Sequence, residues 1–229
     1  MRIPPELSSC NIVLVGDLNP KIFRPDWFVA QELLTKEEGD SADLEILHSE
    51  LSIFRIAWAK IHVDKKRFIA ETEEAPFVRL SDFVTRTFGE FLIHTPISML
   101  GINRRVHFPL KSLEEIDKIG KTLAPQEAWG EWGPKIDGGI DRAKHGGLRS
   151  LSMEQRNLSD REHGHIRAKV EPSTIVHNGI YMEINDHYQI ADENNATTSQ
   201  EIIQLLSANF ESSINRSEWI IDQIMAIVR

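Results

Sequence analysis

The chain of 229 residues is 41% hydrophobic and 27% charged, a composition that excludes collagen-like, fibrous and wholly disordered proteins. Its 26 Lys and Arg residues are outnumbered by 35 Asp and Glu residues, and the formal net charge of −9 opposes broad binding to nucleic-acid phosphates. The single cysteine, Cys10, excludes an internal disulfide and fits a reducing compartment. Because we also expect neither an export signal nor a bilayer-spanning segment, the sequence predicts a cytoplasmic protein with no membrane contact.

The first half of the chain predicts several strands and one amphipathic helix. Residues 11–15 form a short apolar run that is typical of a buried strand. Residues 80–92 place apolar side chains at i, i+3 and i+4, the spacing of a helix with a broad packed stripe, and Pro96 follows its end. We further expect a short helix at 26–34, a charged loop at 36–43, one long strand at 51–63, a turn at 64–66 and a returning strand at 67–72.

Three runs in the chain alternate apolar and polar residues, as strands with one packed face do. They cover residues 100–108, 166–170 and 180–190, and the even positions in them are mostly apolar. The odd positions, counting His165 directly before the second run, carry polar side chains instead: Asn103, Arg105, His107, His165, Arg167, Lys169, Glu183, Asn185 and His187. The alternation therefore predicts a sheet with a polar face that meets water or a partner.

The remaining segments complete an α+β fold. We expect a helix at 113–123, a long loop rich in Gly and Trp at 129–147, and strands near 148–153, 164–170 and 179–190. Thr198 and Glu201 have the spacing of a capping box at the start of a long C-terminal helix that extends to about residue 227. The predicted class is thus α+β, with a largely antiparallel sheet, a packed central helix and a long C-terminal helix.

The domain prediction leaves two arrangements open. One is a single domain over residues 1–229, which we favour because the length fits one large core. The other is a pair of lobes, about 1–125 and 146–229, joined by the loop at 129–147.

Three segments carry a resemblance to other proteins. They are 13–20, VLVGDLNP; 77–108, FVRLSDFVTRTFGEFLIHTPISMLGINRRVHF; and 182–188, MEINDHY. Together they resemble a sporadically distributed bacterial family of uncharacterised proteins that share a helix, an "lGiN" strand and a late "iND" strand. The resemblance implies a bacterial origin, and the patchy distribution implies a role in phage defence or in a toxin-linked operon.

A metal site is one hypothesis for the polar strands. His163, His165, Asp186 and His187 would supply imidazole and carboxylate ligands if neighbouring antiparallel strands brought them together. Such a cluster would suit a metal-dependent hydrolase or nuclease. The alternative is that these histidines are solvated or hydrogen-bonded on a sheet face, and we expect no cofactor.

A ligand groove or a nucleic-acid patch is the second hypothesis. Asn103, Arg105 and His107 would line a groove with Glu183 and His187, supplying an acid/base pair and an anion clamp. Arg104, Arg105, Arg161, Arg167 and Lys169 would instead form a local basic patch, the footprint of a nucleic-acid sensor on an acidic protein.

Tryptophans point to a third kind of site, a surface for a protein partner. Trp129 and Trp132 lie in the loop at 129–147, and Trp219 widens the apolar stripe of the last helix. The alternative for each is core packing. Because neither a nucleophile elbow nor a phosphate-binding loop can be written, enzymatic activity stays uncertain, and the leading hypothesis is a non-enzymatic subunit that assembles with itself or another protein.

Overall fold

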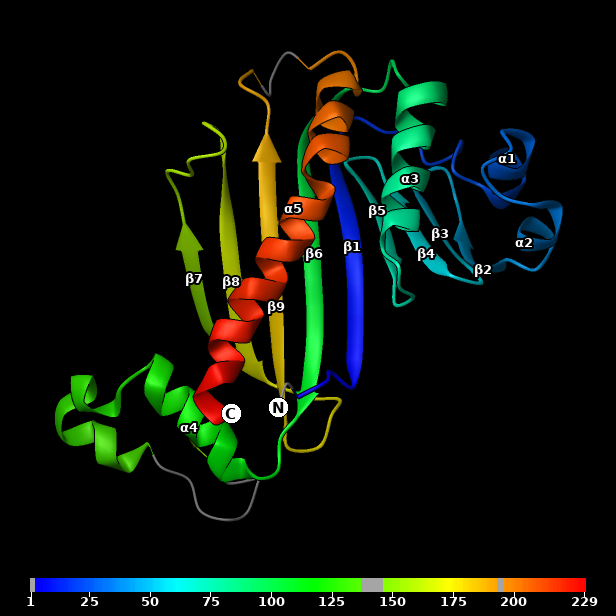
Figure 1. Cartoon of the computed structure of the whole chain (residues 1–229). Helices are drawn as coiled ribbons and strands as arrows, with labels where there is room; N and C mark the ends of the chain where they lie inside the picture. The colour runs from blue at the N-terminus through cyan, green and yellow to red at the C-terminus, as the bar shows by residue number, and fades with distance from the viewer. Residues whose placement is uncertain (1–2, 137–145, 193–195) are drawn as a thin grey trace.

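The structure is a computed structural model that describes residues 3–136, 146–192 and 196–229. Its framework is a nine-stranded sheet in the order β2-β3-β4-β5-β1-β6-β9-β8-β7, in which every neighbouring pair is antiparallel (Figure 1). The strands are β1 (Leu7–Gly16), β2 (Asp43–Leu47), β3 (Leu51–Ile56), β4 (Ala59–Asp64), β5 (Arg67–Thr72), β6 (Ile97–Pro109), β7 (Leu151–Gln155), β8 (Gly164–Pro172) and β9 (Gly179–Gln189).

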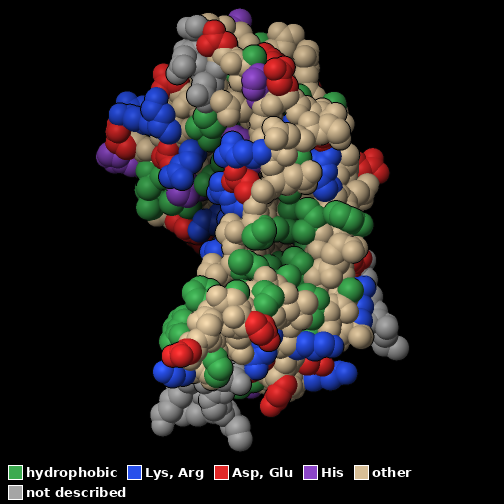
Figure 2. Space-filling view, turned by 90° about the vertical axis from the view of Figure 1, so that its left-hand side faces the viewer, with side chains coloured by type: hydrophobic (Ala, Val, Ile, Leu, Met, Phe, Trp, Pro, Cys, Tyr) green, Lys and Arg blue, Asp and Glu red, His purple; other side chains and the backbone are tan. Residues whose placement is uncertain are grey.

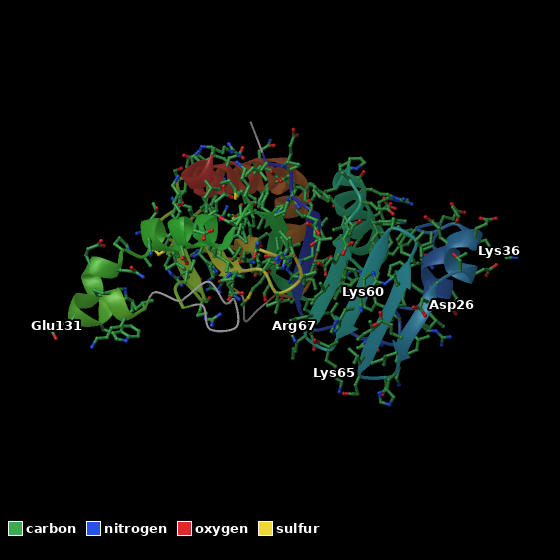
Figure 3. All side chains as sticks on the ribbon, turned by 90° about the horizontal axis from the view of Figure 1, so that it is seen from below. Asp26, Lys36, Lys60, Lys65, Arg67 and Glu131 are labelled. Atoms are coloured by element: carbon green, nitrogen blue, oxygen red, sulfur yellow. The ribbon has the colours of Figure 1, made fainter. Side chains whose placement is uncertain are left out.

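Two helices cover one face of the sheet and the others lie at its ends. The helices are α1 (Pro25–Ala30), α2 (Lys36–Asp40), α3 (Val78–Arg86), the π-helical turn η1 (Thr87–Phe91), α4 (Leu113–Leu123), the 3-10 segment η2 (Gln126–Lys135), α5 (Gln200–Met225) and the closing 3-10 turn η5 (Ala226–Val228). In Figure 3, Asp26 and Lys36 mark the end that carries α1 and α2, and Glu131 marks the opposite end with η2. The predicted α+β class, with an antiparallel sheet and a long C-terminal helix, is confirmed.

The chain builds this sheet from two halves with the same plan. Each half begins with a long strand, β1 or β6, continues through short helices into a meander, and ends in a helix, α3 or α5. The last meander strand returns to pair with the first strand, so β5 pairs with β1 and β9 with β6. The two first strands pair with each other, and one sheet therefore runs through both halves.

The core lies between the sheet and the helices because one set of alternating positions is apolar. Ile102, Ile184 and Ile166 face the helices from β6, β9 and β8 and are almost fully buried. In the first half, Phe28 stacks on Phe83 at 5.1 Å under α3, within a larger group of buried aromatic rings. Burial of such side chains is the main source of folding free energy, at about 25 cal/mol per Å² of apolar surface.

Two predictions about the first half are corrected by the structure. The expected loop at 36–43 contains α2, because Thr35 accepts a hydrogen bond from the Glu38 amide while the Glu38 carboxylate accepts one from the Thr35 amide. The expected long strand at 51–63 is a hairpin, since β3 ends at Ile56 and β4 begins at Ala59.

The second half also differs from expectation at two element starts. The strand expected near 148–153 is β7, which begins at Leu151 and not at residue 148. The capping box expected at Thr198 does not form, because the helix begins one residue later, with Ser199 as its N-cap. The Ser199 hydroxyl donates to the Phe88 carbonyl at 2.7 Å, which ties the start of α5 to η1.

Candidate functional site

The face of the sheet opposite α3 and α5, which we call the open face, carries the polar residues that the alternation predicted. Register places Asn11, Asn103, Asn185 and Arg167 in one row across β1, β6, β9 and β8. Figure 2, seen from the β7 edge, shows a hollow on this side of the molecule, with Lys, Arg and His side chains gathered above it. The three strands that alternate in sequence are therefore neighbours in the sheet.

The three asparagines form a chain of side-chain amides across the open face. Asn185 donates to Asn103, and Asn103 donates to Asn11 over 2.6 Å. The chain ends at Nδ2 of Asn11, which is buried and has no acceptor among the described residues. This ladder binds β1, β6 and β9 to one another through their side chains as well as their backbones.

Arg105 is the centre of a second network on the open face. Its Nε donates to Glu183 at 2.9 Å and its Nη1 to Glu71 at 3.1 Å. Burial lowers the pKa of Arg105, but the two carboxylates raise it by more, so the guanidinium stays charged. The Tyr181 hydroxyl donates to Glu183 at 2.7 Å, and the pKa of Tyr181 is raised by burial and then by this bond.

The other polar residues predicted on this face are also paired. Arg167 donates to Glu154 on β7 at 2.6 Å, and Lys169 lies 2.8 Å from the Glu171 carboxylate. His107 shares a hydrogen bond of 2.8 Å with Ser173, a polar neighbour on the loop after β8. Since Arg167 and Lys169 already have carboxylate partners, the open face offers less attraction for phosphates than the sequence suggested.

Arg104 and Arg161 do not join that basic patch. Arg104 is on the helix side of β6, where its Nη2 lies 2.6 Å from Glu218 of α5 and its side chain is buried. Arg161 is on the loop between β7 and β8 and is also buried on the helix side. For Arg104 the sequence did contain a signal: it occupies an even position of β6, between the apolar residues 102 and 106, and the even positions face the helices.

His165 and His187 are the only pair of the predicted metal cluster that lie together on the open face. Register places them opposite each other in β8 and β9, and their rings stack with centroids 4.6 Å apart. Burial, and then the charge environment of His165 and Arg161, lowers the pKa of His187 to about 4. Burial also lowers the pKa of His165, so both rings are neutral where they stack at neutral pH.

Asp186 and His163 lie elsewhere. Asp186 points to the helix face, where it is fully buried and binds Arg161 and Arg216, the latter at 2.7 Å. His163 lies on an exposed bend before β8. No group of three or more His, Cys, Asp or Glu side chains suited to a metal ion occurs within the described ranges 3–136, 146–192 and 196–229. The four-residue ligand set is thus not brought together by the fold.

Around Asp186 the structure builds an ion cluster that the sequence did not indicate. Arg216 of α5 also binds Asp160 at 2.5 Å, and Arg161 lies 3.2 Å from the same carboxylate. The Arg161 guanidinium stacks 3.9 Å above the Tyr188 ring. Two arginines and two aspartates thus balance in charge and join β9, the β7–β8 loop and α5. The contacts are those of a structural clamp.

A different surface presents apolar groups to solvent. Between α5 and β7 a shallow groove of about 450 Å³ is lined by residues that include Gln155, Leu158, Trp219 and Ile220. Trp219 is 63% exposed, and Met153, which shares a face of β7 with Gln155, is 65% exposed. We call Met153, Leu158, Trp219, Ile220 and the outer edge of β7 the α5–β7 surface. Figure 2 shows hydrophobic side chains across the middle of this side.

The other two predicted partner residues lie on η2. Trp129 and Trp132 are 54% and 56% exposed and meet edge to face, with ring centroids 5.5 Å apart. They border a pocket of about 260 Å³ that also includes Gly120, Ala124 and Leu151. The first part of the predicted loop at 129–147 is therefore a 3-10 segment, while residues 137–145 lie outside the described residues.

The sequence was also compared with known proteins. It matches no protein-family model and no curated protein. Among the helices of the described residues, none combines the length and the apolar character that a membrane crossing requires.

Proposed function

We propose that the protein is a non-enzymatic interaction subunit of a bacterial multi-protein system, and that a protein partner binds its α5–β7 surface. The observation that carries the proposal is the exposure of Trp219 in a groove and of Met153 on β7, the edge strand of the sheet that the described residues form. Contiguous apolar side chains with a polar surround are typical of protein contact sites, and Trp is enriched among the residues that dominate binding energy. The phage-defence or toxin-linked setting of that system rests on the resemblance of three sequence segments.

The open face supports this proposal by what its charges do. A carboxylate lies within 3.1 Å of each of its cations, Arg105, Arg167 and Lys169, so these charges are neutralised by ion pairs within the sheet. A nucleic-acid sensor would need cations that can exchange counterions for phosphates. A metal-dependent hydrolase would need the Asp186 carboxylate beside the two stacked histidines, whereas it lies on the other face. Both alternatives have less support than the interaction subunit.

The test is affinity purification of the tagged protein from its native host with the neighbouring genes intact, followed by mass spectrometry and metal analysis. The variant Trp219→Gln removes the exposed indole and keeps a helix-forming residue at that position. A matched control is Ile175→Gln, since Ile175 is 70% exposed but lies on the loop between β8 and β9.

The expected result is a stoichiometric partner, either another protein or an untagged second copy of this chain, that the wild type and Ile175→Gln retain and Trp219→Gln loses. An interfacial Trp of this kind contributes about 2 kcal/mol or more, so the affinity should fall about 30-fold. A partner that stays bound to Trp219→Gln would contradict the proposed surface. A protein purified alone with about one metal ion per chain would contradict the proposed function and favour the hydrolase.

A further inference from the structure

The two edges of the sheet differ in how they are protected against pairing. Edge strands of natural proteins carry bulges or charges that prevent the addition of another strand. β2 has a bulge, because its register with β3 shifts between Leu44 and Ile46, and it begins with Asp43; its second carboxylate, Glu45, is paired with Lys60 at 2.7 Å. β2 is therefore an edge that discourages pairing.

β7 lacks this protection. Its register with β8 is regular over all five residues, and it contains no proline. The one ionisable residue in the strand, Glu154, is already paired with Arg167 at 2.6 Å and with Arg156 at 2.7 Å. Met153 stands exposed in the middle of the strand. An edge of this kind is covered in a functional assembly or is open to uncontrolled association.

The sequence of β7 fits an antiparallel copy of itself. If two β7 strands paired over their full length, Met153 would lie opposite the second copy's Met153, and Leu151 opposite its Gln155. Glu154 would face the second copy's Ser152, a hydroxyl donor, so that no like charges would meet. The pairing is centred on an apolar contact, and a twofold interface requires such self-complementarity.

We infer that the partner at the edge of β7 is a second copy of this chain, and that two sheets join through antiparallel β7 strands into one continuous sheet. The inference rests on the proposed function, since it names the occupant of the α5–β7 surface. In this arrangement the helix faces of both copies lie on the same side of the joined sheet. Trp219 of each copy then lies in the groove that Gln155 lines, and Gln155 is the residue paired with the second copy's Leu151.

Cysteine crosslinking tests the pairing and its register. The native Cys10 is fully buried and its burial raises its pKa to about 12, so an introduced surface cysteine is the reactive thiol. In Met153→Cys the two new thiols lie on directly opposed residues, whose Cα atoms are about 4.5–5.5 Å apart, within disulfide range. In the control Leu151→Cys they are offset by four residues, about 13 Å, which is beyond that range.

The expected result is a dimer of the purified protein in sedimentation equilibrium and a covalent dimer of Met153→Cys after mild oxidation, but none of Leu151→Cys. Met153→Lys would place two ammonium groups opposite each other and should weaken the dimer at least about tenfold. Leu44→Lys, a change on the other edge strand at a residue that is 52% exposed, should leave the dimer intact. Circular dichroism would show that both lysine variants keep the fold.

Three outcomes would overturn the inference. One is a monomer at every concentration, with no covalent dimer of Met153→Cys. The second is a dimer that Met153→Lys leaves unchanged. The third is equal crosslinking at positions 151 and 153. If the protein were a monomer but bound a host partner that Trp219→Gln loses, only the self-pairing would be refuted and the proposed function would remain. The two failures are therefore distinguishable.

Discussion

The buried carboxylate of Asp186 gives the sharpest stability prediction. Its side chain is 1% exposed and accepts hydrogen bonds from Arg161, which is 7% exposed, and from Arg216. Asp186→Asn keeps the size of the side chain and removes its negative charge, so Arg161 would stay buried with a single carboxylate neighbour, Asp160. Breaking a buried ion pair in this way costs about 3–5 kcal/mol, because one carboxylate would then have to balance two arginines and one positive charge would lack compensation.

The matched control is Asp160→Asn. Asp160 contacts the same two arginines, but its side chain is 32% exposed, and Asp186 would continue to balance both cations. Exposed ion pairs contribute about 0–1 kcal/mol, so this variant should lose at most about 1 kcal/mol. The two substitutions remove the same charge and differ only in burial.

Urea denaturation, followed by tryptophan fluorescence, measures both variants against the wild type. In thermal unfolding the expected loss for Asp186→Asn corresponds to a decrease of about 6–20 °C in Tm for a chain of this size. If Asp186→Asn were as stable as the wild type, or if Asp160→Asn lost as much unfolding free energy as Asp186→Asn, the buried ion pairs of Asp186 would not stabilise the fold as proposed. A rise in stability on adding Zn²⁺ that Asp186→Asn abolishes would restore the metal hypothesis.

Two further predictions concern the open face and the start of β8. In the folded protein the pKa of His187 is held at about 4, against an ordinary 6.5. Above pH 6.5 the ring is neutral in both the folded and the unfolded chain. As the pH falls from 6.5 toward 4, the unfolded chain binds the proton first, so the free energy of unfolding decreases. The full difference corresponds to about 3 kcal/mol, and solvent screening of this half-buried ring reduces the expected loss to about 1–2 kcal/mol. His187→Asn should therefore show a smaller decrease in unfolding free energy than the wild type between pH 7 and pH 4, and parallel curves would refute the assignment. Gly164→Ala should destabilise the protein by about 1–3 kcal/mol, because Gly164 has φ of +131° and an added Cβ would lie 2.2 Å from the His187 carbonyl oxygen; an unchanged urea midpoint would contradict this.

The sequence predicted the faces of the sheet because side-chain direction in a strand depends only on position. Asn103, Asn185 and Arg167 alternate with apolar residues, and the structure places all three in one row of the open face. The order of the strands was not predictable in the same way, since it depends on which strand returns to β1 and β6 across long connections. The three strands of the second meander were therefore predicted, but their position next to β6 in the sheet was not.

Sequence alone could not place the members of the metal and basic-patch hypotheses relative to one another, because strand register and partner charges decide which side chains meet. Asp186 occupies an even position of β9, and in that strand the even positions are apolar, so its own alternation indicated the helix face. Its partner Arg216 is 30 residues away on α5, a distance that no local pattern spans. The short helix α2 had a readable signal in Thr35 and Glu38, whereas the turn between β3 and β4 contains neither glycine nor proline and had none.

Hydrogen–deuterium exchange of the free chain, diluted until it is monomeric, and of the complex purified from its host tests the central claim most directly. Binding at the α5–β7 surface predicts slower exchange in β7 and in the part of α5 around Trp219, while β1 and β6 exchange as before. Protection confined to the strands of the open face, or none in β7 and α5, would contradict the account.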